Sequence, residues 1–444
     1  MLTIKRVATV VSNYQEDGDA GGTVNEENRQ IQDLGCGRNC LGPCCLPFSK
    51  LPLYAIKNEE DEIVGTDYEN SAKDGHLSFL HNLLLGQWED RMNKGMFRYD
   101  VTSCETKIIP GSYGFIAQLN EGRHLKKRPT EFRIDQVLQP FDENKFNFKK
   151  VGQEEVLFRF EPSHDNKSHY VPCSPVEVES PSVVAINVSP IEYGHVLLIP
   201  RLLDCLPQRI DRDSFMLALR WAKEAADPYF RVGYNSLGAF ATINHLHFQA
   251  YYLTVPFPVE KAPTCRILTR IGLNNAELTV SQLLNYPVRG FVFEGGWKSQ
   301  DLADFVASTC IYFQNNNIPF NVLITDCGKK IFVFLQCYAE KQALGEVSQE
   351  LLATQVNPAV WEISGHIVLK RRKDYDDASE DYVWRLLSEV SMTEERFKEV
   401  KAYVVEAAKL ESATGDNTSK SKESIDEPCS PEVPSMPRDC LVLH

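Results

Sequence analysis

The sequence predicts an α+β fold in which antiparallel sheets are covered by helices on one side. Strand-like and helix-like segments alternate between about residues 46 and 410. Apolar residues make up 43% of the 444 residues and charged residues 24%, which provides ample material for a core. A chain of this length suggests two to three domains, or one duplicated unit with long ends.

The helices are predicted from apolar residues at helical spacing. Residues 79–91 and 211–226 show this pattern, and the second segment has Asp residues in its first turn and Pro228 beyond its end. Near the C-terminus, Ser391 and Glu394 suit a capping box before a third helix. The strands are predicted from short runs of β-branched or aromatic residues bounded by Gly, Pro or Asn. They are 183–188, 195–199, 241–253, 320–325 and 331–338.

The two ends of the chain are expected to be disordered. Residues 13–35 are acidic, rich in Gly and Asn and nearly free of large apolar side chains, and residues 412–444 mix Ser, Pro, Glu and Lys without a period. The predicted organisation is a flexible leader over 1–45, a first half over 46–260, a second half over 261–410 and a disordered tail over 411–444.

Composition excludes several classes of function. Acidic residues outnumber basic ones by 61 to 47, and the resulting net charge of -14 repels phosphate backbones and anionic bilayers. No apolar run is long enough to span a membrane, and the N-terminus lacks the apolar stretch of a secretory signal. We therefore expect no nucleic-acid or membrane partner and a cytoplasmic location, with a nuclear pool and the oligomeric state left open.

The cysteines favour a reducing compartment, because 13 of them are scattered over a chain that has a core of its own. Cys36, Cys40, Cys44 and Cys45 lie close together and could in principle hold zinc. Structural zinc sites usually rest on C-x2-C pairs, whereas three residues, three residues and none separate these cysteines. A reduced leader is favoured, and no metal or cofactor is expected.

The most informative segment is NHLHFQAYYL, residues 244–253. Side chains alternate faces along a strand, so His245, His247 and Gln249 are predicted to share one face, with a core behind them. Two histidines in a strand are also compatible with satisfied core residues, and any half-solvated strand alternates in this way. The surrounding sequence has to decide between these alternatives.

The surrounding sequence has a recognisable order. INVSPIEYGHVLLIP, residues 186–200, places Asn187 at the end of one strand, and the predicted helix and then FRVGYNSLGAFATINHLHFQ follow. This order resembles the histidine triad superfamily, whose members read D/N-x-S-P, GH-x-L-x-IP, helix, a strand with Asn and H-x-H-x-H/Q. Gln249 at the last position resembles the transferase branch, which includes galactose-1-phosphate uridylyltransferases and dinucleoside polyphosphate phosphorylases. The resemblance implies histidine-triad-like antiparallel sheets with covering helices.

A second resemblance covers nearly the whole chain between its ends. LNEGRHLKKRPTEFRIDQVLQPFDENKFNFKKVGQEEVLFRF, residues 119–160, together with LLLGQWEDRM and IKRVATVVSNYQ, is similar to plant GDP-L-galactose phosphorylases of ascorbate biosynthesis. Related uridylyltransferases carry zinc on a C-x2-C pair, which this chain lacks. The resemblance implies a nucleotidyltransferase that uses inorganic phosphate to convert GDP-L-galactose, and GDP-D-glucose, to hexose 1-phosphate and GDP.

By that resemblance His247 is the nucleophile. It attacks the α-phosphorus of the GDP-hexose to form a guanylylated histidine, which phosphate then converts to GDP. Imidazole suits this chemistry, since an unperturbed pKa of about 6.5 leaves it largely neutral and nucleophilic at cellular pH. His245 is expected to orient the site through its carbonyl or its ring, and Gln249 to donate an amide N–H to phosphoryl oxygens.

The same resemblance implies nucleotide-binding residues. Asn187 is placed like the ribose-binding residue of the family, and Asn235, Ser236 and Gly238 like its phosphate-side loop. Each of the four is also compatible with a turn residue that satisfies local backbone. The basic run GRHLKKR, residues 122–128, is either a solvated surface patch or a funnel for anionic substrates.

An internal duplication is also suggested. Asn321 followed by FVFLQ at 332–336 echoes Asn235 followed by HLHFQ at 245–249, with Phe in place of both histidines. A degenerate second half of this kind would leave one catalytic site per chain. Two other functions stay open: a hexose-1-phosphate nucleotidyltransferase with a sugar phosphate as acceptor, and a nucleotide-binding regulator without turnover.

Overall fold

The computed structural model of the chain describes residues 3, 6, 51–57, 78–121, 123, 132–163, 167–172, 178–271, 276–296, 298–414 and 423–425. The Cys36–Cys45 cluster and nearly all of the leader lie outside these residues, as does the basic run 122–128 except Arg123. No helix in the described part of the chain is long and apolar enough to cross a membrane.

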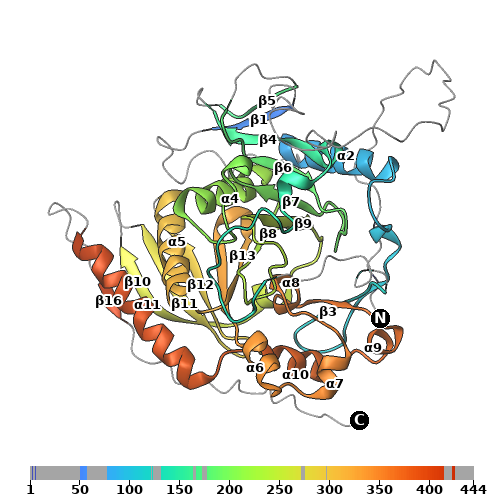
Figure 1. The fold of residues 1–444 in the computed structure, drawn as a ribbon. Helices are drawn as coiled ribbons and strands as arrows, with labels where there is room; N and C mark the ends of the chain where they lie inside the picture. Colours follow the sequence, from blue (N-terminus) through green and yellow to red (C-terminus); the bar gives the residue numbers. More distant parts are fainter. Residues whose placement is uncertain are drawn as a thin grey trace, which may run out of the picture.

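One large sheet dominates the structure (Figure 1). In the described residues it has 13 strands in the order β16-β10-β11-β12-β14-β13-β8-β9-β7-β6-β4-β1-β5, and all neighbours are antiparallel except β1 and β4. Its strands are β1 (Leu53–Ile56), β4 (Val156–Pro162), β5 (His169–Val171), β6 (Val183–Ile186), β7 (Val196–Ile199), β8 (Phe230–Asn235), β9 (Phe248–Tyr252), β10 (Thr264–Ile271), β11 (Glu277–Leu283), β12 (Gly290–Gly295), β13 (Phe320–Thr325), β14 (Lys330–Leu335) and β16 (Glu423–Ile425). A small sheet contains β2 (Thr106–Ile108), β3 (Ile116–Leu119) and β15 (His366–Leu369) in the order β15-β3-β2.

Helices occur together with mostly antiparallel strands, so the α+β class is confirmed (Figure 1). Helices cover both faces of the large sheet, so the prediction of helices on one side is wrong. Alternate side chains of β12, β13 and β14 pack into two different cores, one with α4, α5 and α11 and the other with α8 and α10. The α-helices are α2 (Phe79–Asn93), α4 (Arg212–Ala225), α5 (Ser299–Asn315), α6 (Tyr338–Leu344), α7 (Gln349–Ala353), α8 (Val360–Ile363), α9 (Arg372–Asp376), α10 (Glu380–Val390) and α11 (Glu394–Thr414). Short 3-10 helices are Val101–Ser103, Phe148–Lys150, Gln153–Glu155, Leu202–Asp204, Pro258–Lys261 and Asp326–Gly328.

Local sequence explains where the long helices begin. The Asp211 carboxylate accepts a hydrogen bond from the Ser214 backbone N–H at 2.8 Å and so caps α4. The capping box predicted before α11 is wrong, because the Thr393 hydroxyl, not Ser391, accepts from the Arg396 N–H at 3.3 Å. Ser391 instead ends α10.

Several predicted boundaries shift. The predicted strand 241–253 narrows to β9, and residues 241–247 lead into β9 without ladder pairing. The predicted strand 331–338 ends at Leu335, and Tyr338 begins α6. In the segment predicted as a disordered tail, α11 continues to Thr414 and β16 pairs antiparallel with β10.

Two parts of the large sheet repeat the same order of elements. The chain runs β6, β7, α4, β8, β9 in the first part and β11, β12, α5, β13, β14 in the second. The two parts meet where β8 pairs antiparallel with β13, and Asn235 lies opposite Asn321. Read outward from this seam, the strand order is β8-β9-β7-β6 on one side and β13-β14-β12-β11 on the other. Corresponding strands of the two parts therefore occupy corresponding places in the sheet.

Candidate active site

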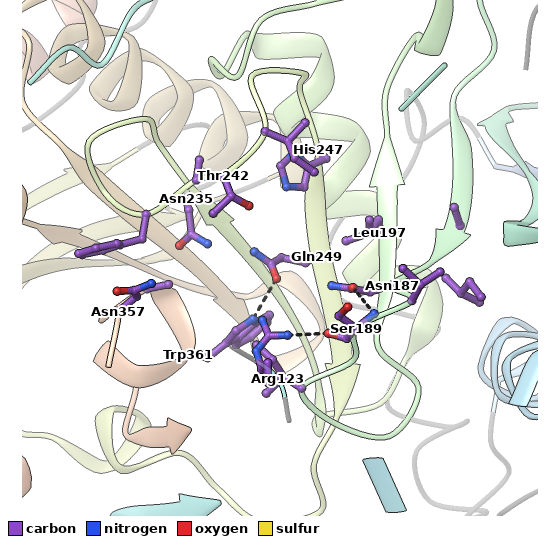
Figure 2. A pocket seen from close by; sticks show the side chains of 18 of the residues that line it. Arg123, Asn187, Ser189, Leu197, Asn235, Thr242, His247, Gln249, Asn357 and Trp361 are labelled. Atoms are coloured by element: carbon purple, nitrogen blue, oxygen red, sulfur yellow. Dashed lines mark hydrogen bonds between the residues drawn. The ribbon is translucent and has the colours of Figure 1, made fainter. Parts of the chain in front are cut away.

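A cavity lies beside the seam and receives side chains from both parts of the chain (Figure 2). One wall comes from β6, β7 and the segment that leads into β9, and the opposite wall comes from the segment around α8 and β15. The polar and charged residues that line it are Arg98, Arg123, Glu155, Asn187, Ser189, Asn235, Thr242, His247, Gln249, Asn357, Glu362 and Lys370.

The backbone of His247 is held from both sides by Gln208. The Gln208 side-chain carbonyl accepts from the His247 N–H at 3.0 Å, and its amide nitrogen donates to the His247 carbonyl at 3.2 Å and to the Asn235 carbonyl at 2.9 Å. Gln208 is itself fixed, because its backbone N–H donates to the Asn244 side chain at 2.8 Å. The residue before β9 thus has a defined position although it makes no ladder contact.

The ring of His247 has a defined proton arrangement. Its Nδ1 lies 2.8 Å from the His245 carbonyl oxygen, which can only accept, so Nδ1 carries the proton and Nε2 has the lone pair. The edge of the His247 ring meets the Phe148 ring, with centroids 4.9 Å apart. Burial lowers the pKa of His247 to about 4. The imidazole is therefore neutral at cellular pH, as a nucleophile must be.

His245 does not share the cavity face with His247, so the prediction of one common face is wrong for this residue. Its Nδ1 accepts from the Phe148 backbone N–H at 3.1 Å, and its ring contacts the rings of Phe141 and Phe148, with centroids 5.4 Å and 5.5 Å away. Burial lowers the pKa of His245 to about 3. What His245 presents to His247 is its backbone carbonyl, one of the two orienting groups that the sequence left open.

Gln249 lines the cavity on β9 with a fixed amide orientation (Figure 2). Its Oε1 accepts from the indole N–H of Trp361 at 3.2 Å and lies 3.3 Å from Nε2 of His195. Nδ1 of His195 accepts from the Ile191 N–H at 2.8 Å, so its proton is on Nε2 and is donated to Gln249. With two donors on the oxygen, the amide N–H groups of Gln249 are the part that a ligand can use.

The four predicted nucleotide-binding residues fall into two groups. Asn187 and Asn235 line the cavity. The Asn187 oxygen accepts from the Ser189 N–H at 3.0 Å, and the Asn235 oxygen accepts from Asn321 at 2.6 Å and from the Val360 N–H at 2.9 Å. Both side chains are therefore fixed at the cavity wall.

Ser236 and Gly238 are not among the residues that line the cavity. The Ser236 hydroxyl accepts from the Phe320 N–H at 3.0 Å and so links the end of β8 to the start of β13. Gly238 has a φ of 78°, and a Cβ there would lie 3.0 Å from the Ile134 carbonyl oxygen, so the turn requires glycine. These two residues match the alternative interpretation as turn residues.

Sequence reasoning missed Gln208 and Trp361. Gln208 lies in an irregular segment before α4, and Trp361 is in a four-residue helix more than a hundred residues after Gln249. Neither has a periodic or motif signal. Tertiary contact alone brings them to His247 and Gln249.

The cavity wall is chemically divided. An apolar side contains Phe146, Phe148, Val151, Leu197 and Ile243, and it adjoins the His247 ring. In Figure 2, Arg123 lies beyond Gln249 from His247, beside Ser189 and Trp361. The guanidinium of Arg123 donates to the Ser189 carbonyl at 2.6 Å. The arrangement suits a ligand that has a flat apolar part beside His247 and an anionic part beyond Gln249.

These observations define an α+β protein with a buried, neutral histidine in a cavity between two similar sets of strands. The chain matches the family models described as "GDPGP1-like, N-terminal domain" over residues 79–251 and "GDPGP1-like, C-terminal domain" over residues 258–411, and it belongs to this family. It is 64% identical over 408 residues to GDP-L-galactose phosphorylase 1 of Arabidopsis thaliana, which covers 92% of this chain and 89% of that one.

A more distant relative is GDP-D-glucose phosphorylase 1 of Homo sapiens, 32% identical over 335 residues, with 72% of this chain and 82% of that one covered. The solved structure of yeast Ap4A phosphorylase Apa2 is similar with a TM-score of 0.47 at 15% identity, over 71% of this chain and 96% of that chain. The family named from sequence motifs alone is therefore confirmed by the relatives.

Proposed function

We propose that this chain catalyses the phosphorolysis of GDP-L-galactose, and of GDP-D-glucose, to hexose 1-phosphate and GDP. The observation that carries the proposal is the state of His247, which is buried, neutral and holds its proton on Nδ1 while Nε2 has a lone pair. The relatives indicate the substrates, since they are GDP-L-galactose and GDP-D-glucose phosphorylases.

The reaction proceeds in two displacements at the α-phosphorus. Nε2 of His247 attacks, the bond from phosphorus to the bridging oxygen breaks, and hexose 1-phosphate leaves with the electron pair. The His245 carbonyl stabilises the positive ring of the guanylylated histidine through the Nδ1–H contact at 2.8 Å. An oxygen of inorganic phosphate then attacks, the P–N bond breaks, and its electron pair returns to Nε2 as GDP is released.

The other cavity residues bind and orient the substrate in this proposal. The amide N–H groups of Gln249 donate to the α-phosphoryl oxygens, and Asn187 contacts the ribose. Asn235 contributes to the phosphate side of the cavity. The rings of Phe146 and Phe148 form the apolar side, which suits a guanine base. Ser236 and Gly238 form the turn that follows Asn235 and leads to Thr242 in the cavity wall.

We also propose that the two halves, 46–260 and 261–410, arose by tandem duplication and that the second half is degenerate. Each half places a strand five residues after a helix: β8 begins at Phe230 after α4, and β13 begins at Phe320 after α5. If the first residues of these two strands are matched, Gly233 of β8 corresponds to Leu323 of β13. Their ladder partners then correspond as well, so Gln249 of β9 matches Phe332 of β14. The sequence echo instead matched Gln249 with Gln336, so the strand pairing supports a different register. Neither register places a histidine of the second half opposite His247.

The acidic charge balance supports a protein without nucleic-acid or membrane partners, and the 13 scattered cysteines support a cytoplasmic location. Its substrates in the proposal are a GDP-hexose and inorganic phosphate. The side chains of Asn187, Gln249 and Arg123 can provide the polar contacts of such a ligand.

The test is incubation of the purified protein with GDP-L-galactose or GDP-D-glucose, with and without phosphate, followed by product analysis. Phosphate-dependent formation of GDP and hexose 1-phosphate is expected. Formation of a new GDP-hexose only when a sugar phosphate is supplied would identify a nucleotidyltransferase instead. Absence of any labelled nucleotide on the protein, with binding retained, would indicate a regulator without turnover.

A further inference from the structure

Among the described residues that line the cavity, three are cationic, in a chain with a net charge of -14. Two of them lie at the ends of neighbouring strands. β3 and β15 run parallel in the small sheet with Leu119 opposite Leu369, and Lys370 follows β15 directly. Arg123 lies four residues after β3 ends. Both cations therefore lie beyond the carboxyl ends of two parallel strands, where ligands commonly bind to sheets.

Both side chains are held at the cavity by backbone carbonyls. One guanidinium nitrogen of Arg123 donates to the Ser189 carbonyl at 2.6 Å, which leaves further N–H donors of the fork for a ligand. The Lys370 ammonium donates to the Gln355 carbonyl. Burial lowers the pKa of Lys370; the nearby carboxylate of Glu362 opposes this shift, and Arg123 adds to it. Arg123 and Lys370 line the same cavity, so an anion bound there would be attracted by both charges.

The chemistry of the proposed reaction requires an anion in one particular place. The nucleophile and the leaving group lie on opposite sides of phosphorus in an in-line displacement. In the first step the β-phosphoryl group leaves from the side opposite His247, and in the second step the acceptor must approach from that same side. The β-phosphoryl group and inorganic phosphate therefore use the same position.

We propose that Arg123 and Lys370 form a single phosphate subsite that is used twice. It binds the β-phosphoryl group of the GDP-hexose in the first step and inorganic phosphate in the second. Figure 2 places Arg123 beyond Gln249 from His247, where this group would lie. Arg suits it because its planar fork binds phosphate through two hydrogen bonds, and Lys adds a point charge. The inference rests on the proposed function for the identity of the two substrates.

Shared use has a consequence that separate subsites lack. Loss of either cation should weaken both substrates together, and inorganic phosphate should compete with the GDP-hexose for the unmodified enzyme. The variants are Lys370→Met and Arg123→Gln, with Lys373→Met as the matched control, since Lys373 is an exposed lysine on α9 three residues along the chain. Lys370→Arg retains the charge and serves as the conservative variant.

The measurements are the KM for phosphate, the KM for GDP-hexose and the inhibition constant of phosphate against guanylylation of the free enzyme. We expect all three to rise at least about tenfold in Lys370→Met and Arg123→Gln, because a lost hydrogen bond to a charged group has that effect. Lys373→Met should stay within about twofold of the wild type, and Lys370→Arg should recover most of the affinity. Unchanged values, or a rise confined to one substrate, would overturn the shared subsite.

A second readout separates this inference from the proposed function. Calorimetric titration of the full chain with inorganic phosphate alone needs no turnover. If the wild type forms no guanylylated protein, the proposed function fails, and phosphate binding that Lys370→Met abolishes still supports the subsite. If the wild type turns over and both variants, folded by circular dichroism, bind phosphate as it does, the subsite assignment is wrong.

Discussion

Gln208→Met tests whether the backbone position of His247 depends on one buried amide. Methionine has nearly the length of glutamine, so the substitution removes the three side-chain hydrogen bonds to His247 and Asn235 without opening a large cavity. At about 0.5–1.5 kcal/mol for each net hydrogen bond, the loss of three bonds should lower the free energy of unfolding by about 1.5–4.5 kcal/mol. A displacement of His247 by about 1 Å should lower the rate of guanylylation by roughly a hundredfold.

The assay combines urea unfolding with single-turnover formation of labelled protein from a GDP-hexose. Gln349→Met is the control, because Gln349 is an exposed glutamine at the start of α7, and it should match the wild type in both measurements. The KM for GDP-hexose should change little in Gln208→Met, since the Asn235 side chain keeps its hydrogen bonds from Asn321 and the Val360 N–H. A Gln208→Met protein with wild-type stability and guanylylation rate would refute the assignment of Gln208 as the group that positions His247.

Four further predictions follow from the same contacts. His247→Asn should abolish turnover by orders of magnitude while the protein stays folded, and His245→Asn should cost less because its carbonyl remains; labelled nucleotide on the His247→Asn protein would show a different nucleophile. Gln249→His should raise the GMP to GDP product ratio at fixed phosphate, because an imidazole can act as a base for water where an amide cannot; an unchanged or smaller ratio would limit Gln249 to phosphate binding. Arg6→Met should lower the free energy of unfolding by about 3–5 kcal/mol in urea titrations, since it leaves the buried Glu192 carboxylate without its ion pair; a loss below about 1 kcal/mol would mean that Glu192 finds another partner. Burial lowers the pKa of four histidines below the unfolded value, so acid favours the unfolded state, and the free energy of unfolding should fall as pH drops below about 6.5, by on the order of 1.4 kcal/mol per pH unit for each histidine. These pKa values are about 3 for His195, His245 and His366 and about 4 for His247, so equal stability at pH 7 and pH 5 would contradict the burial of neutral imidazoles.

Periodicity predicted the elements of the fold well where the pattern is local. The helices 79–91 and 211–226 appear as α2 and α4 with small shifts at their ends, and 320–325 is β13. The failures are places where side chains compete for the same role. Thr393 and Ser391 are both able to cap a helix. Ser391 ends α10 and forms a β-bridge with Gln336, a contact distant in sequence, and Thr393 caps the next helix.

The candidate site was only partly predictable. The motif gave His247 and Gln249, because alternation and neighbouring sequence are both local signals. It failed for His245, since alternation assumes a regular strand and the segment before β9 has no ladder pairing. Trp361 and Lys370 could not be found from the sequence by pattern. Trp361 reaches the cavity through the packing of α8, and Lys370 reaches it through the pairing of β15 with β3.

The central claim is that Nε2 of His247 carries the nucleotide during turnover. The most direct measurement is rapid quenching of the protein after mixing with GDP-L-galactose labelled in the α-phosphate, without inorganic phosphate, followed by peptide mapping under alkaline conditions by mass spectrometry. The account predicts one acid-labile GMP per chain, located on His247, that disappears with formation of GDP when phosphate is added. Turnover with no labelled peptide, or with the label on any other residue, would contradict it.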